Sequence, residues 1–109
     1  MLFNLTRDAN KLLHAIYKAY KERIESGMDI DQAVRFGSTA KIQSEFFSHA
    51  TVSSIDHWCK ELSRHQYLDC MFADGEAYYV CLSDKAISEL EDELKNNIKG
   101  IFNAATQLI

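Results

Sequence analysis

The sequence contains no proline, and this absence favours long uninterrupted helices joined by short turns. It also lacks any apolar run that approaches the roughly 20 residues a helix needs to cross a bilayer. The opening residues MLFNL are too short for the apolar core of a signal peptide, and Asp8 follows soon after. We therefore expect a cytoplasmic protein.

Cysteine is scarce, with three residues and no C-x-x-C pair. An odd number at these spacings argues against a disulfide framework and against a zinc ribbon. We expect Cys59, Cys70 and Cys81 on apolar faces, as small hydrophobic side chains. A metal site that combined them with His57 or His65 would lack the paired spacing of zinc sites, so we expect no metal and no cofactor.

Catalytic motifs are missing as well: the chain has no Gly-rich phosphate loop, no G-x-S-x-G and no H-E-x-x-H. Ser53, His57 and Glu61 share one helical face and imitate a catalytic triad. A solvated helix face, however, lacks the buried carboxylate and the oxyanion donors that such a mechanism needs. We therefore do not expect an enzyme.

The composition itself is that of a globular protein. The chain has 109 residues, of which 47% are hydrophobic and 26% charged, and this size predicts a single domain over residues 1–109. The net charge of −4 argues against a nonspecific nucleic-acid coat, although it permits a local basic patch. Residues 1–23 form such a region, because their five basic residues outweigh Asp8 and Glu22 and give +3.

The first helix is predicted over residues 5–24, where apolar residues recur at helical period. Its opposite, basic side is either an ordinary solvated face or an electrostatic track for phosphate or an acidic partner. Gly27 is expected to end the helix. The following residues predict a short helical turn through Val34 closed by Gly37, with a short strand over residues 34–36 as the alternative.

A second helix is expected after the cap residue Ser38, with four inward side chains: Ala40, Ile42, Phe46 and Phe47. Thr51 is a good N-cap for a third helix, on which Val52, Ile55, Cys59 and Leu62 form one apolar stripe and Trp58 widens it.

A β-hairpin follows, with strands over residues 68–73 and 76–82 joined by Asp74-Gly75, a strong signal for a two-residue turn. Alternation places Leu68, Cys70 and Phe72 on one face of the first strand, and Tyr78, Val80 and Leu82 on one face of the second. Both faces of the hairpin are apolar, so it is either covered on two sides or exposes a contact surface.

The last helix starts at the cap Ser83 and continues to residue 107, about 36 Å at about 1.5 Å per residue. This length exceeds what a small domain needs, and the surplus packs either on the first helix or on a second copy. We favour a homodimer, the commonest oligomer. The expected interface residues are Leu94, Ile98, Ile101, Phe102, Ala105 and Leu108.

This order of elements, carried by TVSSIDHWCKELSRHQYLDCMFADGEAYYVCLSDKAISEL, resembles the winged helix-turn-helix superfamily over residues 5–94. The resemblance implies a mainly α (α+β) fold with a two-stranded β-hairpin wing and a long C-terminal helix. It also implies a small transcriptional regulator that reads the major groove of double-stranded DNA with the helix starting at Thr51.

By the same resemblance, one group of residues would approach base edges: Thr51, Ser53, Ser54 and His57. A second group would approach phosphates: Lys60, Arg64 and, on the preceding helix, Lys41. The sequence departs from the family at the wing, which carries Asp69, Asp74 and Glu76 and no basic residue. The alternative is a protein–protein interaction module that uses Met71, Tyr78 and Tyr79 on the wing, or the basic first helix.

Overall fold

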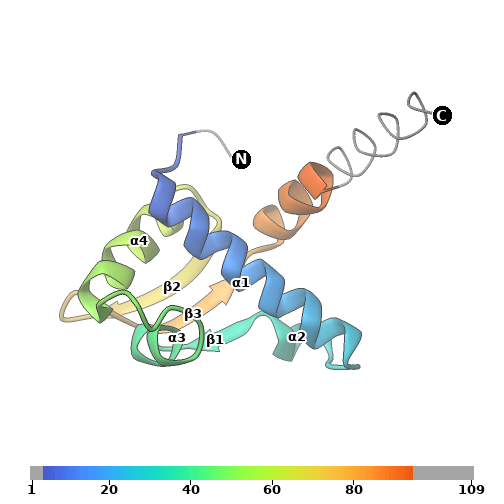
Figure 1. The fold of residues 1–109 in the computed structure, drawn as a ribbon, viewed down its shortest axis with the longest axis horizontal. Helices are drawn as coiled ribbons and strands as arrows, with labels where there is room; N and C mark the ends of the chain where they lie inside the picture. Colours follow the sequence, from blue (N-terminus) through green and yellow to red (C-terminus); the bar gives the residue numbers. More distant parts are fainter. Residues whose placement is uncertain (1–3, 95–109) are drawn as a thin grey trace.

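In the computed structural model, residues 4–94 are described, and they form five helices and a three-stranded antiparallel sheet (Figure 1). The α+β class expected from the sequence is therefore confirmed. The elements follow in this order: α1 (Arg7–Glu25), α2 (Ile30–Ala33), β1 (Arg35–Gly37), α3 (Thr39–Phe46), α4 (Val52–Arg64), β2 (Leu68–Ala73), β3 (Glu76–Leu82) and a last helix over residues 84–94.

Both ends of α1 follow from local chemistry. The Thr6 side chain accepts a hydrogen bond from the Ala9 N–H, so the helix starts two residues later than predicted. At the other end Gly27 has a φ of 97°, and Met28 N–H donates to Arg23 C=O at 3.0 Å. This closing pattern requires a left-handed residue and confirms Gly27 as the end signal.

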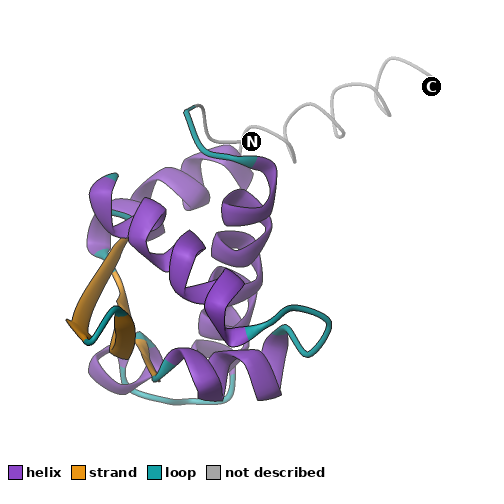
Figure 2. Cartoon of the chain, turned by 90° about the vertical axis from the view of Figure 1, so that its left-hand side faces the viewer, coloured by secondary structure: helices purple, strands orange, loops and turns teal. Residues whose placement is uncertain are grey.

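The segment after α1 contains both of the structures that the sequence left open. The four-residue helix α2 is followed at once by β1, which pairs antiparallel with β3. The sheet order is β1-β3-β2, so the hairpin expected as a two-stranded unit is part of a three-stranded sheet. Figure 2 shows the strands grouped beside the helices.

The hairpin turns at Asp74-Gly75, where both residues have positive φ, 53° and 83°, as the sequence predicts. The pairing then shifts between Met71 and Phe72, which face Tyr79 and Ala77. This bulge leaves Tyr78 as the extra residue. Ala77 is consequently buried and Tyr78 is 55% exposed, so the strict alternation that put Tyr78 on the inner face was wrong.

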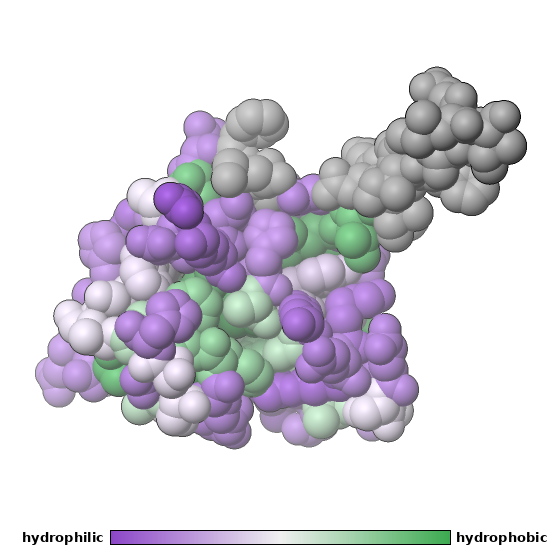
Figure 3. Space-filling model, viewed as in Figure 1, coloured by the Kyte–Doolittle hydropathy of each residue, from purple (hydrophilic) through white to green (hydrophobic). Residues whose placement is uncertain are grey.

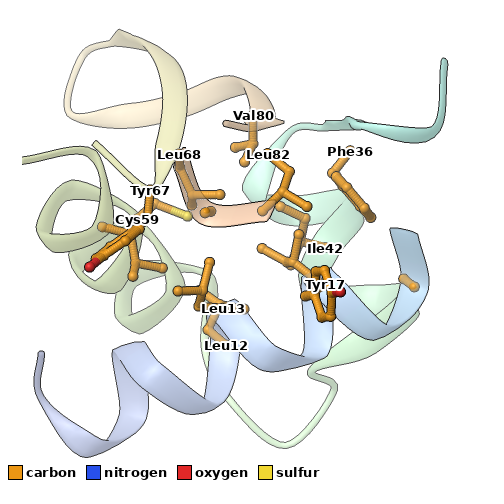
Figure 4. Packing of buried hydrophobic residues seen from close by; sticks show 14 of the residues in the cluster. Leu12, Leu13, Tyr17, Phe36, Ile42, Cys59, Tyr67, Leu68, Val80 and Leu82 are labelled. Carbon is orange, nitrogen blue, oxygen red and sulfur yellow. The ribbon is translucent and has the colours of Figure 1, made fainter. Parts of the chain in front are cut away.

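One hydrophobic core joins the helices to the inner face of the sheet, as Figure 4 shows. Side chains from all five described helices and from three strands meet there, among them Leu12, Leu13, Tyr17, Phe36, Ile42, Cys59, Leu68, Val80 and Leu82. Ala40 is exposed on α3, which corrects its predicted inward position, and Thr39 is buried instead. The Thr39 hydroxyl donates to the Ala77 C=O at 3.3 Å, which explains its burial.

The last helix is capped by Ser83, whose hydroxyl accepts from Ala86 N–H at 3.1 Å, as expected. Figure 3 shows apolar atoms beside this helix where it leaves the body of the protein. Leu94, the last described residue of this helix, is 45% exposed. The predicted extension to residue 107 lies outside the described residues, as do the other predicted interface residues: Ile98, Ile101, Phe102, Ala105 and Leu108. Among residues 4–94, no helix has the length and apolar character to span a bilayer.

Candidate nucleic-acid interface

Helices α3 and α4 meet at a corner that side chains hold in place. Thr51 caps α4, since its hydroxyl oxygen accepts from Ser54 N–H at 3.1 Å. The Gln43 amide of α3 donates to the backbone oxygens of Ser48 and Ala50, at 3.4 and 3.1 Å. The direction in which α4 leaves the corner is thus set by hydrogen bonds from both helices.

The exposed side of α4 carries most of the residues predicted to contact DNA. Ser53, His57, Lys60 and Arg64 are all exposed and recur at steps of four, three and four residues, which places them in one stripe along the helix. We call these four residues the α4 stripe. The structure thus brings them together as the helical spacing predicted.

The remaining predicted contacts flank this stripe. Thr51 is exposed, whereas Ser54 is half-buried and accepts a hydrogen bond from the Thr51 hydroxyl at 2.9 Å, so both hydroxyls serve the cap. Lys41 is exposed on α3, and its aliphatic chain passes Gly37, where a Cβ would stand 3.2 Å from the Lys41 Cδ. Gly37 therefore leaves room for the Lys41 side chain.

The two carboxylates of α4 are both turned inward. Asp56 is 5% exposed and accepts from Ala77 N–H at 3.0 Å. Glu61 is 6% exposed and accepts from the N–H and hydroxyl of Thr6, at 2.6 and 2.9 Å. The prediction that Glu61 lies on the solvated face was wrong. The exposed side of α4 therefore bears positive charge only, from Lys60 and Arg64.

Sequence reasoning missed both structural roles, although one of them had a signal. Asp56 lies four residues after Val52 and three before Cys59, so it belongs to the apolar stripe, where a carboxylate needs a buried donor. Glu61 had no comparable signal, because its partner Thr6 is 55 residues away in the sequence.

The hairpin turn lies against the N-terminal half of α4. A hollow of about 310 Å³ separates them, lined by residues of both elements: Val52, Ser53, Asp56, His57, Lys60, Asp74, Gly75 and Glu76. The Lys60 ammonium stands 3.8 Å from where a Cβ on Gly75 would lie. An acidic turn thus borders the α4 stripe on one side, close to Lys60.

The hairpin is about as long as α4. The helix has 13 residues and β2 has 6, and at about 1.5 and 3.4 Å per residue each spans about 20 Å. Because β2 runs back along α4 after the turn at Gln66, the tip at Asp74-Gly75 reaches only the start of α4. The acidic tip therefore stays level with the helix.

The outer side of the hairpin exposes apolar side chains. Met71 and Tyr78 are each 55% exposed, Phe72 is 37% exposed, and Tyr79 is half-buried. The Tyr78 hydroxyl donates to the Met71 sulfur at 3.6 Å. The sequence left open whether the hairpin is covered on both sides. Its outer side has exposed apolar residues that resemble a contact surface.

Three further observations on the described residues concern the apparent catalytic triad, the cysteines and metal binding. Glu61 faces Thr6 and is not available to His57, so the apparent triad does not form. The interaction between the Cys59 and Cys70 thiols, together with burial, raises the pKa of Cys59, and the same interaction lowers the pKa of Cys70. Within residues 4–94, no three His, Cys, Asp or Glu side chains are grouped to hold a metal ion.

Comparison with known proteins finds no relative of this chain. The chain matches no protein-family model, no curated protein and no solved structure.

Proposed function

We propose that this protein is a cytoplasmic winged helix-turn-helix regulator that binds double-stranded DNA with α4 in the major groove. The observation that carries the proposal is the exposed side of α4, which presents cations and hydroxyls while both of its carboxylates are buried and hydrogen-bonded. A helix that approaches a phosphate backbone gains from cations and loses from every exposed carboxylate.

The arrangement of elements also supports this proposal. Two helices meet at a fixed corner, the second exposes a polar face, and a hairpin follows with a short extra strand paired to it. This is the order that a winged helix-turn-helix domain implies. In that class the start of the second helix contacts base edges in the major groove.

The residues then have separate roles in the proposed complex. Ser53 and His57 lie nearest the N-terminus of α4 and would approach base edges, with Thr51 and Ser54 beside them. Hydroxyls discriminate weakly between bases, so sequence preference would be modest. Three cations would contact phosphates: Lys41, Lys60 and Arg64. The acidic tip of the hairpin borders Ser53, His57 and Lys60, so its charges would oppose the phosphate contacts and add nothing to them.

Binding as a homodimer would place two copies of α4 on half-sites about one turn of DNA apart. Leu94, half-exposed at the end of the last described helix, supports an interface there. We expect Leu94→Asp to convert a dimer to a monomer in sedimentation velocity runs, and Asp92→Ala, an exposed change on the same helix, to leave the dimer intact. A wild-type chain that is monomeric at all concentrations would exclude the dimer.

The DNA proposal is tested by fluorescence anisotropy with random-sequence duplex DNA at low salt. Arg64→Ala and Lys60→Ala should each weaken binding severalfold, since each removes one phosphate contact. Lys18→Ala is the matched control, because it removes the same charge from an exposed site on α1. An equal loss with Lys18→Ala would indicate nonspecific attraction, and no binding by the wild type would exclude the proposal.

A second candidate function is a protein-interaction module that does not bind DNA. The exposed apolar residues Met71, Phe72 and Tyr78 and the acidic hairpin favour it. The same anisotropy experiment separates the two, because a module of this kind would show no salt-dependent DNA binding that Arg64→Ala weakens.

A further inference from the structure

Strand β2 lies at one edge of the sheet, and its outer side is open. The order β1-β3-β2 gives it a single neighbour, β3. Among the described residues, no backbone hydrogen bond reaches the outer side of β2 between Asp69 and Ala73. Asp69, Met71, Phe72 and Ala73 are exposed, so the edge is accessible. Such an edge is a template for another strand.

The pairing of β3 shows which groups of β2 face this open edge. Ala77 N–H donates to Asp56, and Leu82 N–H donates to Val34 C=O at 2.9 Å, so both point away from β2. Residues that turn away in this manner form non-hydrogen-bonded pairs, whose partners also turn outward. The partners are Phe72 and Leu68. Phe72 is exposed, so its N–H and C=O groups are free to pair with an added strand, whereas Leu68 is buried in the core.

The side chains around this edge indicate what kind of strand would fit. Met71, Phe72 and Tyr78 offer apolar contact area. The hairpin over residues 68–82 has three acidic residues, Asp69, Asp74 and Glu76, and no basic one. Edge-to-edge pairing with a second copy would bring these like charges together, which is unfavourable. A strand with basic residues would gain instead.

We propose that the outer edge of β2 binds an extended segment of a partner protein in which apolar residues alternate with lysine or arginine. The segment adds to the sheet as a fourth strand: the backbone groups of Phe72 supply hydrogen bonds, Met71 and Tyr78 supply apolar contacts, and Asp69 attracts the basic side chains. This surface shares no residue with the α4 stripe, so the inference is independent of DNA binding.

The decisive variant is Phe72→Pro. Proline removes the outward N–H and is tolerated at an edge position whose N–H the ladder does not use. Phe72→Val is the matched control, because it also loses the aromatic ring but keeps the N–H. Circular dichroism and thermal unfolding check that both variants are folded.

The probe is a phage-displayed library of random linear dodecapeptides, selected on the full chain. We expect the enriched peptides to alternate apolar and basic residues and to bind Phe72→Val nearly as well as the wild type. Their affinity for Phe72→Pro should fall about tenfold, as expected for a lost backbone hydrogen bond. Equal affinity for Phe72→Pro and Phe72→Val, or the absence of enriched peptides, would overturn the proposal.

Two further measurements cover the remaining outcomes. Asp69→Lys, an exposed substitution, should weaken the binding of the basic peptides. If Phe72→Pro does not fold, an unchanged affinity of these peptides for Asp69→Lys overturns the proposal. Sedimentation velocity on the wild type, Phe72→Val and Phe72→Pro tests whether a second copy of the chain occupies the edge instead. Self-association that only Phe72→Pro abolishes would assign the edge to a second copy and exclude the basic partner.

Discussion

At the scale of single residues, Glu61 connects α4 to the start of α1. Its carboxylate accepts two hydrogen bonds from Thr6, which itself caps α1. Since bonds to a buried charge contribute about 1.5–3 kcal/mol each, we expect Glu61→Ala to lower the free energy of unfolding by about 3 kcal/mol. Urea denaturation measures this change. Glu45→Ala, at an exposed position of α3, should change it by less than about 0.5 kcal/mol. Similar losses in both variants would contradict the role of Glu61.

Tyr67 gives a prediction about pH. Its ring is buried and its hydroxyl donates to Glu89 at 2.6 Å, and burial together with this bond raises the pKa of Tyr67 from 10.0 to about 12. A raised pKa means that the folded state favours the neutral phenol, so this stabilisation is complete below about pH 10 and is lost as the pH rises through about 12.

Absorbance titration of tyrosinate checks this expectation. The difference in tyrosinate absorbance between the wild type and Tyr67→Phe should titrate near pH 12. The variant should also lose less stability than the wild type between pH 10 and 12. A difference that titrates near pH 10, the ordinary value, would show that Tyr67 is not held by Glu89.

At the scale of elements, the hairpin is held against α4 by Asp56. The Ala77 N–H, beside the bulge, donates to this carboxylate and points away from β2. We expect Asp56→Ala to increase amide exchange at Ala77 by at least tenfold and to cost about 2 kcal/mol of stability, because a buried N–H loses its partner. Asp74→Ala, at the exposed tip, should leave Ala77 protected in exchange experiments followed by NMR. Equal exchange in both variants would contradict the anchor.

At the scale of the whole molecule, the net charge of −4 and the cationic side of α4 make opposite contributions to DNA binding. Three cations per protomer, Lys41, Lys60 and Arg64, would release counterions on binding. The slope of log K against log salt concentration should therefore be about −3 for a monomer and about −5 for a dimer, at about −0.9 per phosphate. A slope near zero would exclude phosphate contacts by this face.

Much of the architecture could be predicted from local signals. Thr51, Ser83 and Gly27 mark helix ends by side-chain or backbone chemistry that acts within a few residues, and Asp74-Gly75 needs only its own positive φ values. The α4 stripe followed from helical period alone. These features depend on neighbours in sequence, which is why the pattern was sufficient.

Other features depend on partners that are distant in sequence. The bulge at Tyr78 changes which residue faces the core, and no periodicity indicates where the ladder shifts. Strand β1 has only three residues and is stabilised by β3, about 45 residues later. The inward turn of Glu61 likewise requires Thr6. Such contacts become visible only when the chain is folded.

The burial of both α4 carboxylates also bears on how this protein could be re-engineered. On α4, the positions that hold the fold and the positions that face outward are separate residues. A library randomised at Ser53, His57, Lys60 and Arg64 should keep the thermal stability of the parent while it samples new surface chemistries. A library of equal size at Ile55, Asp56, Cys59 and Glu61 should yield mostly unfolded chains.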